Sequence, residues 1–334
     1  MLNLMKNFFK GFCIITMLLA GSCRKFEKFP LWVGNKEMLV YKYSNSSAST
    51  PPAAELIEQS KFISVDAASA TNIGQNTIRI SLEGVRVQSS RNNFEVKKVK
   101  ISEREEGSRK WQQQSEFSLN TSASKTDIAS VLVLDMSTSL GGVVDDLKKY
   151  AKTFAHTVVE GTTNSKVAVI FFSTRSAIQS TAFYDASNIG QLDALIDGYT
   201  NYQDRTALFE ATKAGLDLLG ALSFQGSKSL VVFTDGGDND SNNPDDLKAT
   251  INNSEIARYT IGLKGADFDK KDLESIGSDK GNNVIAKKES DLEDVFSQIT
   301  KQVVSIYHIE YDRSDQILNQ SIEILFEVEL DKIK

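Results

Sequence analysis

The chain has 334 residues, of which 40% are hydrophobic and 25% charged, and its formal net charge is −6. This composition is typical of a globular protein with room for one large domain or two ordinary ones. The one dense basic run, residues 97–100, is too short to form a phosphate-binding surface. The chain is therefore not expected to bind nucleic acid.

The first 22 residues have the pattern of an export signal. Two lysines precede a mostly apolar stretch, residues 11–22, which is shorter than the roughly 20 residues that span a bilayer. Residues 19–23, Leu-Ala-Gly-Ser-Cys, resemble the lipobox of bacterial lipoproteins, with Ala20 where most lipoboxes carry leucine. The resemblance implies that Cys23 is lipidated and becomes the first mature residue.

Cysteine usage supports the lipid anchor. Cys13 lies in the segment that would be removed, so Cys23 would be the one cysteine left and no internal disulfide could form. An ordinary signal peptide cut near Ser22 is the alternative. The anchor predicts contact with a lipid bilayer in the bacterial cell envelope. Arg24 after the cysteine favours the outer membrane by analogy with enterobacterial sorting, without distinguishing its surface from its periplasmic face.

The part of the chain before residue 126 contains a low-complexity stretch and a region with a period of two. Residues 44–54 are rich in Ser, Ala, Thr and Pro, which is typical of a tether or long loop. Apolar and polar residues alternate in 77–82, 94–101 and 111–119. This alternation predicts half-buried antiparallel strands.

From residue 128 on, continuous apolar runs alternate with amphipathic segments. The apolar runs predict buried strands at 131–134, 167–172, 230–233, 259–263 and 284–286. The amphipathic segments predict helices at 143–158, 189–195, 244–251, 292–304 and from Ala207 onward. Strands that alternate with helices predict an α/β fold with a mostly parallel sheet covered on both faces.

The period of two returns in residues 306–311 and 322–330 and predicts a C-terminal β-hairpin. We expect it to form one β-sandwich with the N-terminal strands, into which the α/β domain is inserted; two separate small β elements are the alternative. The predicted divisions are a signal peptide (1–22), a lipidated N-terminus and flexible tether (23–60), an N-terminal strand region (61–125), an α/β domain (126–305) and the hairpin (306–334).

Oxygen-bearing side chains follow two of the predicted buried strands. Asp135, Ser137 and Ser139 follow the first strand, and Asp235 follows the third. Ligands of open parallel sheets bind at the carboxyl ends of strands. Thr206 directly precedes a predicted helix. Taken singly, these residues have simpler explanations. Asp135 with Ser137, or Thr206, could cap a helix, and Asp235 with the following glycine could form a turn.

Together these five residues resemble the metal-ion-dependent adhesion site of von Willebrand factor type A domains, over residues 128–307. The resemblance implies a Rossmann-like domain that binds Mg²⁺, with Mn²⁺ or Ca²⁺ as alternatives. It implies direct hydroxyl ligands from Ser137, Ser139 and Thr206, while Asp135 and Asp235 orient the shell. It also implies an open metal position for a carboxylate of a protein or extracellular-matrix ligand, as in cell adhesion.

Some features depart from the family pattern. Residues 204–205, Asp-Arg, stand where many relatives have glycine before the threonine. The pair 145–146, Asp-Asp, comes too late after the second serine to predict a second cation site. The loop 235–246 is not a calcium loop, because Asn243 and Ala249 replace the required glycine and glutamate. We expect an acidic, solvated loop there.

The sequence contains none of the common catalytic motifs for nucleophilic, zinc-dependent or phosphoryl-transfer chemistry. We therefore expect a binding protein and no enzymatic activity. The alternative function is a scaffolding or assembly subunit of an envelope complex, in which the same domain docks one fixed partner.

Overall fold

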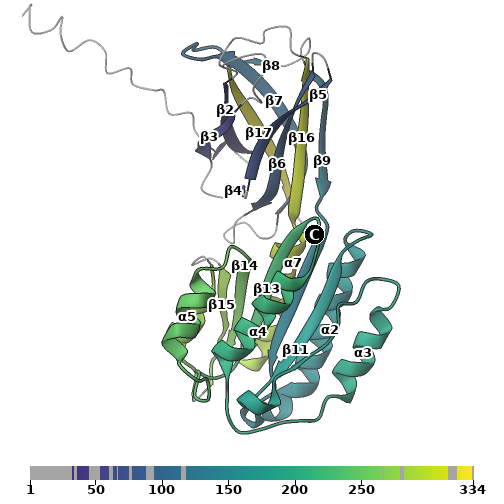
Figure 1. Ribbon diagram of the computed structural model, residues 1–334, viewed down its shortest axis with the longest axis vertical. Coiled ribbons are helices and arrows are strands. Elements are labelled where there is room, and N and C mark those ends of the chain that lie inside the picture. The colour runs from purple at the N-terminus through teal and green to yellow at the C-terminus, as the bar shows by residue number, and fades with distance from the viewer. Residues whose placement is uncertain are drawn as a thin grey trace, which may run out of the picture.

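The computed structural model describes residues 32–33, 36–44, 53–59, 63–65, 67–74, 77–87, 94–113, 118–265, 267–278, 282–314 and 322–332. Three sheets account for its strands. Two antiparallel sheets form the upper module in Figure 1, and the third sheet forms the lower module together with the helices. Within the described residues, no helix has the length and apolar character needed to cross a bilayer. The predicted signal peptide and Cys23 lie outside these residues.

The lower module is built on a six-stranded sheet whose order is β12-β11-β10-β13-β14-β15. All neighbouring pairs are parallel except β11 and β12. The strands are β10 (Ile128–Asp135), β11 (Lys166–Phe172), β12 (Gln179–Ser180), β13 (Ser227–Thr234), β14 (Ala257–Leu263) and β15 (Asn283–Ala286). Every residue of β10 is buried, which explains its uninterrupted apolar sequence.

Helices cover both faces of this sheet. One face packs against α2 (Val144–Glu160), α3 (Ile189–Gly198) and α7 (Leu292–Val304). The other packs against α4 (Leu208–Ala221), α5 (Pro244–Asn252) and α6 (Lys270–Ile276). The predicted α/β fold with a mostly parallel, doubly covered sheet is confirmed. Helix α6 was not predicted, because its seven residues are too short to establish a helical period.

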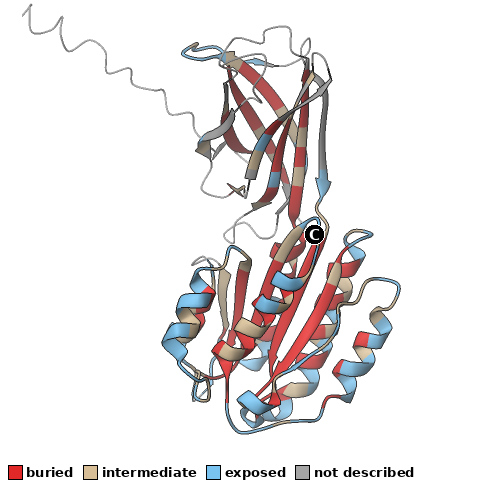
Figure 2. Ribbon diagram, in the orientation of Figure 1, coloured by how far each residue is buried: buried red, intermediate tan, exposed pale blue. Residues whose placement is uncertain are grey.

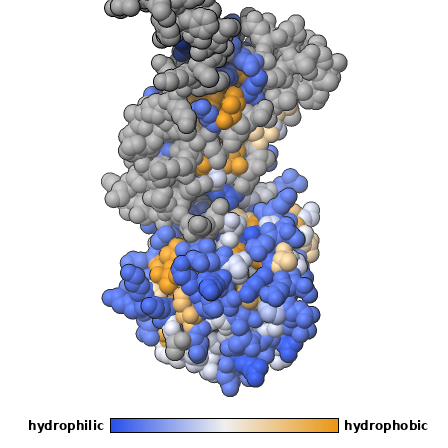
Figure 3. All heavy atoms as spheres, turned by 90° about the vertical axis from the view of Figure 1, so that its left-hand side faces the viewer, coloured by the Kyte–Doolittle hydropathy of each residue, from blue (hydrophilic) through white to orange (hydrophobic). Residues whose placement is uncertain are grey.

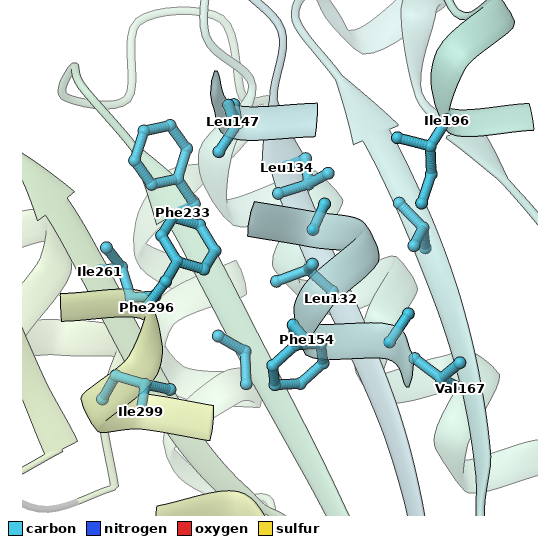
Figure 4. Packing of buried hydrophobic residues seen from close by; sticks show 14 of the residues in the cluster. Leu132, Leu134, Leu147, Phe154, Val167, Ile196, Phe233, Ile261, Phe296 and Ile299 are labelled. Atoms are coloured by element: carbon cyan, nitrogen blue, oxygen red, sulfur yellow. The ribbon is translucent and has the colours of Figure 1, made fainter. Parts of the chain in front are cut away.

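Alternate side chains of β10 point to opposite faces of the sheet and enter separate cores. Leu132 and Leu134 contact the face of α2 and α7, where Phe154, Phe233 and Phe296 gather (Figure 4). Phe233 and Phe296 have ring centroids 5.6 Å apart. Figure 2 shows the central strands buried along their length and the outward faces of the helices exposed. The sheet is therefore a rigid base for the loops at its ends.

The upper module is a β-sandwich whose two sheets share one core. The first sheet contains β1 (Trp32–Val33), β2 (Lys36–Ser44), β3 (Ala53–Gln59), β7 (Phe94–Glu105), β8 (Gln112–Gln113) and β17 (Ile322–Lys332). The second contains β4 (Ile63–Ser64), β5 (Ala67–Gly74), β6 (Thr77–Val87), β9 (Ser118–Lys125) and β16 (Ile306–Ser314). Tyr41 and Phe326 of the first sheet pack with Tyr311 of the second.

The structure corrects three predictions about these strands. The C-terminal strands do not form a hairpin, because β16 pairs with β6 and β9 whereas β17 pairs with β2 and β7 in the other sheet. The segment 23–60 is not simply a tether, since it supplies β2 and β3. The single strand predicted at 111–119 is divided between β8 and β9, which lie in different sheets. The alternation of apolar and polar residues predicts that one face of a strand is buried, but it does not predict to which sheet the strand belongs.

The lower module is inserted between β9 and β16. The chain enters it through residues 126–127 and leaves it at Ser305, after α7. The two crossings are adjacent, because the amide of Thr126 donates to the carbonyl oxygen of Ile306 at 2.9 Å. Both crossings lie at the amino ends of the parallel strands, so the carboxyl ends lie at the far, lower end of the molecule in Figure 1.

Candidate metal centre

The predicted site residues lie at the carboxyl ends of β10 and β13, which we call the metal edge. Strand β10 pairs with β11 on one side and with β13 on the other, so the chain direction across the sheet reverses at β10. Ligands bind at such switch points because the loops on either side diverge. Leu134 is in register with Phe233, which brings the residues that follow, Asp135 and those around Asp235, close together.

Asp135 is fully buried and both of its carboxylate oxygens are hydrogen-bonded. Oδ1 accepts the backbone N–H of Ser137 at 2.9 Å, and Oδ2 accepts the hydroxyl of Thr234 at 2.6 Å. These two bonds fix the orientation of the carboxylate. The Ser137 side chain makes no helix-capping hydrogen bond at the short 3-10 helix that follows, η2 (Thr138–Val143), so the capping alternative is not observed.

Two serine hydroxyls converge on the second carboxylate. The Ser137 and Ser139 hydroxyls lie 2.9 Å apart, and they donate to Oδ1 of Asp235 at 3.5 and 3.1 Å respectively. Asp235 and Ser137 are 7% and 2% exposed, whereas Ser139 is exposed. Side chains almost 100 positions apart in the chain therefore form one cluster of oxygen atoms that opens towards solvent at Ser139.

Thr206 is held beside this cluster by the loop that follows β13. Its N–H donates to Oδ1 of Asn239 at 2.8 Å, and its carbonyl oxygen accepts the amides of Asn239 and Asp240. Its hydroxyl lies next to Gly236, where an added Cβ would be 3.5 Å from Thr206 Oγ1. At the start of helix α4 the Phe209 N–H donates to Asp238, and no hydrogen bond of the described residues joins a helix amide to the Thr206 side chain, so the alternative capping role of Thr206 is not observed. Among the hydrogen bonds of the described residues, none joins its side chain to the other four site residues.

Two residues that hold the site were missed by the sequence analysis. Thr234 positions Asp135, and Asn239 positions Thr206. Thr234 directly precedes Asp235, so a hydroxyl at the end of β13 was an available signal. Nothing in the sequence near Asn239 separates it from the other polar residues of its loop.

The residues that depart from the family pattern have structural roles. Arg205 lies 3.4 Å from Asp240, so its charge is directed towards the acidic loop. Asp238 accepts the Ser241 hydroxyl at 2.5 Å and the Phe209 amide at 3.3 Å, which fastens the loop to α4. In the part of the chain that the structure describes, no three His, Cys, Asp or Glu side chains gather as a metal site.

The electrostatics of the cluster fit a cation. Burial, together with the charge of Asp235, raises the pKa of Asp135 to about 7, and burial also raises the pKa of Asp235. Neither carboxylate has an ion pair with Lys, Arg or His among the described residues. Buried carboxylates without a counter-ion are costly, and hard cations prefer carboxylate and hydroxyl oxygens. The donor set present here therefore fits Mg²⁺ or a similar ion.

The raised pKa of Asp135 predicts how metal-free stability depends on pH. The pKa of an unfolded aspartate is about 3.9, so between about pH 4 and 7 the folded protein binds more protons than the unfolded chain. The free energy of unfolding in chelator should fall as pH rises through this window. Urea unfolding at pH 5, 6 and 8 measures it. Mg²⁺ should restore stability at pH 8, and Asp135→Asn should flatten the profile; an unchanged slope in that variant would contradict the assignment.

Gly141 shapes the loop that carries Ser139. Its φ of 47° and ψ of −118° lie in a region that residues with a Cβ rarely adopt. We expect Gly141→Ala to lower the free energy of unfolding by about 1–2 kcal/mol through backbone strain, since no atom would contact the added Cβ. The control is Gly142→Ala, which has equal space and no positive φ. Urea unfolding of both variants compares them, and equal effects would rule out strain as the cause.

The doubly covered sheet defines a Rossmann-like domain, and a cluster of carboxylate and hydroxyl oxygens lies at its switch point. The family model of the von Willebrand factor type A domain matches residues 131–298, which is half of the chain. The chain belongs to the von Willebrand factor type A domain family. No curated protein matches the sequence.

Solved structures with a similar fold come from animals and bacteria. Proximal thread matrix protein 1 from the mussel byssus, with a zinc-occupied MIDAS motif, is 18% identical, with a TM-score of 0.46; the match covers 58% of this chain and 49% of that one. The von Willebrand domain of the type V pili tip protein Mfa5 from Porphyromonas gingivalis is 14% identical, with a TM-score of 0.41 and coverages of 53% and 95%. BatB from Bacteroides thetaiotaomicron is 15% identical, with a TM-score of 0.39 and coverages of 52% and 98%. The chain thus spans about half the length of the mussel protein.

Proposed function

We propose that this protein binds a protein or matrix ligand through a divalent cation at the metal edge. The observation that carries the proposal is the convergence of Ser137 and Ser139 on Asp235, beside the buried carboxylate of Asp135. Mg²⁺ is the proposed cation. Ser137, Ser139 and Thr206 would hold it, and the two aspartates would orient the shell and balance its charge.

The residue types explain why such a site would act as a receptor. A bound hard cation supplies Lewis acidity at a position that a partner's oxygen can occupy. Three of the five proposed site residues are neutral hydroxyls, so they leave part of the ion's charge unbalanced. Ser139 is exposed, so the site is open to an approaching surface. A partner carboxylate is the group best suited to complete the shell, and we propose no catalytic step.

We also propose that Cys23 carries a lipid that anchors the protein in the bacterial cell envelope, at the outer membrane. The lipobox-like sequence before Cys23 supports this location. Expression of the full chain and of Cys23→Ala, followed by membrane fractionation and mass spectrometry of the N-terminus, tests it. The native chain should fractionate with membranes and carry the lipid mass. Membrane retention of the alanine variant would contradict the anchor.

The binding function is tested first on the metal and then on the partner. Calorimetry should detect Mg²⁺ binding to the native protein and its loss in Asp135→Ala, whereas Asp146→Ala, an exposed acid on α2, should bind normally. Pull-downs from host and envelope extracts then compare Mg²⁺ with chelator. Partners that bind equally in both would exclude metal-dependent recognition. One stoichiometric partner would favour the scaffolding function over adhesion.

A further inference from the structure

A hollow of about 400 Å³ adjoins the metal edge next to Ser139 and Asp235. Leu140, Val143 and Leu263 provide its apolar surface, and Lys264 and Lys288 add two positive charges. We call it the lysine hollow. Ligand sites commonly combine an apolar surface with a few polar groups. Figure 3 shows that the lower end of the molecule, seen from the side of α5 and β15, is predominantly hydrophilic.

The topology of the sheet places these lysines beside the proposed cation. Lys264 directly follows β14, and Lys288 comes two residues after β15. Leu263 and Ala286 are paired in the parallel ladder, so both lysines leave the sheet at the edge that Asp235 occupies on β13. At this edge, the carboxylates and hydroxyls lie at the ends of β10 and β13, and the two lysines lie at the ends of the neighbouring strands β14 and β15.

The charges around the hollow are not neutralised by strong pairing. Lys264 is exposed and has no ion pair with any acid in the described part of the chain. Lys288 lies 3.9 Å from Asp291, and its side chain is 72% exposed, so that pair is weak. Glu289 also lines the hollow and is exposed. Glu289 and the carboxylate of Asp235, which also lines the hollow, balance the two lysine charges, and a cation bound at Asp235 would leave the hollow positive.

The other side of the metal edge has the opposite sign. The loop after β13 carries Asp238 and Asp240, and α5 begins with Asp245 and Asp246. Arg175 and Arg205 pair with Asp240 and offset two of these four charges, so this side remains net negative. An acidic ligand that reaches the cation is therefore repelled on this side and attracted towards Lys264. This difference fixes a direction of approach as well as a position.

We infer that the partner is an acidic polypeptide segment that binds with two carboxylates, one at the cation and a second at Lys264 and Lys288, with an apolar side chain between them in the lysine hollow. This inference rests on the proposed function, because the first carboxylate needs the metal. The second carboxylate adds selectivity that the five metal-site residues do not provide.

The test uses the full purified protein with Mg²⁺ and capped synthetic peptides. One series has two aspartates separated by one, two or three valines, and a matched series has asparagine in place of the second aspartate. Calorimetry or NMR titration compares the native protein with Lys264→Met/Lys288→Met. Lys125→Met on β9 is the control, since it removes an exposed lysine in the other module. Mg²⁺ titration of each protein checks the metal site separately.

The native protein and Lys125→Met should bind the best two-aspartate peptide about fivefold more tightly than its asparagine partner. The double variant should lose this preference while its Mg²⁺ affinity and its binding of the asparagine peptide remain. Equal, metal-dependent binding of both peptides by the native protein would overturn the inference and leave the proposed function standing. A preference retained by the double variant would also overturn it. Absence of any Mg²⁺-dependent peptide binding would overturn both.

Discussion

Replacement of Asp235 by asparagine is expected to weaken Mg²⁺ binding roughly 10- to 100-fold. The Asp235 carboxylate accepts both serine hydroxyls at Oδ1. Asparagine can keep that acceptor, but it removes the negative charge that would balance the cation and replaces the second oxygen by an amide group that only donates. Isothermal calorimetry with Mg²⁺ or Mn²⁺ measures the change. The fold should survive, because asparagine has nearly the same shape.

The Asp235→Asn experiment has a control in the same loop and a second readout. Asp246→Asn removes an exposed charge in the first turn of α5 and should leave metal affinity unchanged. In chelator at pH 8, Asp235→Asn should be at least as stable as the native protein, because it removes repulsion between two buried carboxylates. A variant that binds Mg²⁺ as the native protein does would show that Asp235 is not part of the site.

Replacement of Leu132 by alanine is expected to lower the free energy of unfolding by about 3 kcal/mol. Leu132 lies in the middle of β10, is fully buried and packs among the aromatic residues between the sheet and α2 (Figure 4). Truncation removes buried methyl groups and leaves a cavity that the flanking strands hold open. Urea unfolding of the full chain measures the loss.

Leu195→Ala is the matched control for Leu132→Ala, since it is the same substitution at a side chain that is 43% exposed on α3. Its cost should be below about 1 kcal/mol, because little buried apolar surface is lost. Similar costs for the two variants would contradict the central position of β10 in the core.

Most of the lower module could be predicted from the sequence; the short elements α6 and β12 could not. Its strands are buried on both faces and therefore appear as unbroken apolar runs, while helices such as α2 carry one apolar stripe. The same regularity predicted that Asp135 and Asp235 follow strands at the same edge of the sheet, and the structure shows that these two strands are neighbours. The residues that position the site were harder to predict, because Thr234 bonds Asp135 and Asn239 bonds Thr206 through contacts that depend on loop paths, and loop paths have no period.

The arrangement of the upper module could not be predicted in detail. A period of two predicts that one face of a strand is buried, but the strands with which it pairs depend on contacts between distant segments of the chain. Strand β9, with the sequence SLNTSASK, has little apolar alternation and belongs to the sandwich because it pairs with β16. The division of β16 and β17 between two sheets depends on the shared core, in which Tyr311 and Phe326 meet.

The adjacent crossings between the modules have a mechanical consequence. If the sandwich is held and the metal edge is pulled, the load passes through β9 and β16 together, in the same direction along their axes. Strand β9 pairs with β16, and β16 pairs with β6 from Ile306 to Ser314. Pulling therefore shears the whole β16–β6 ladder at once, and many hydrogen bonds must break together. The connection fails when the sandwich unfolds, so its lifetime under force is set by the rate of unfolding.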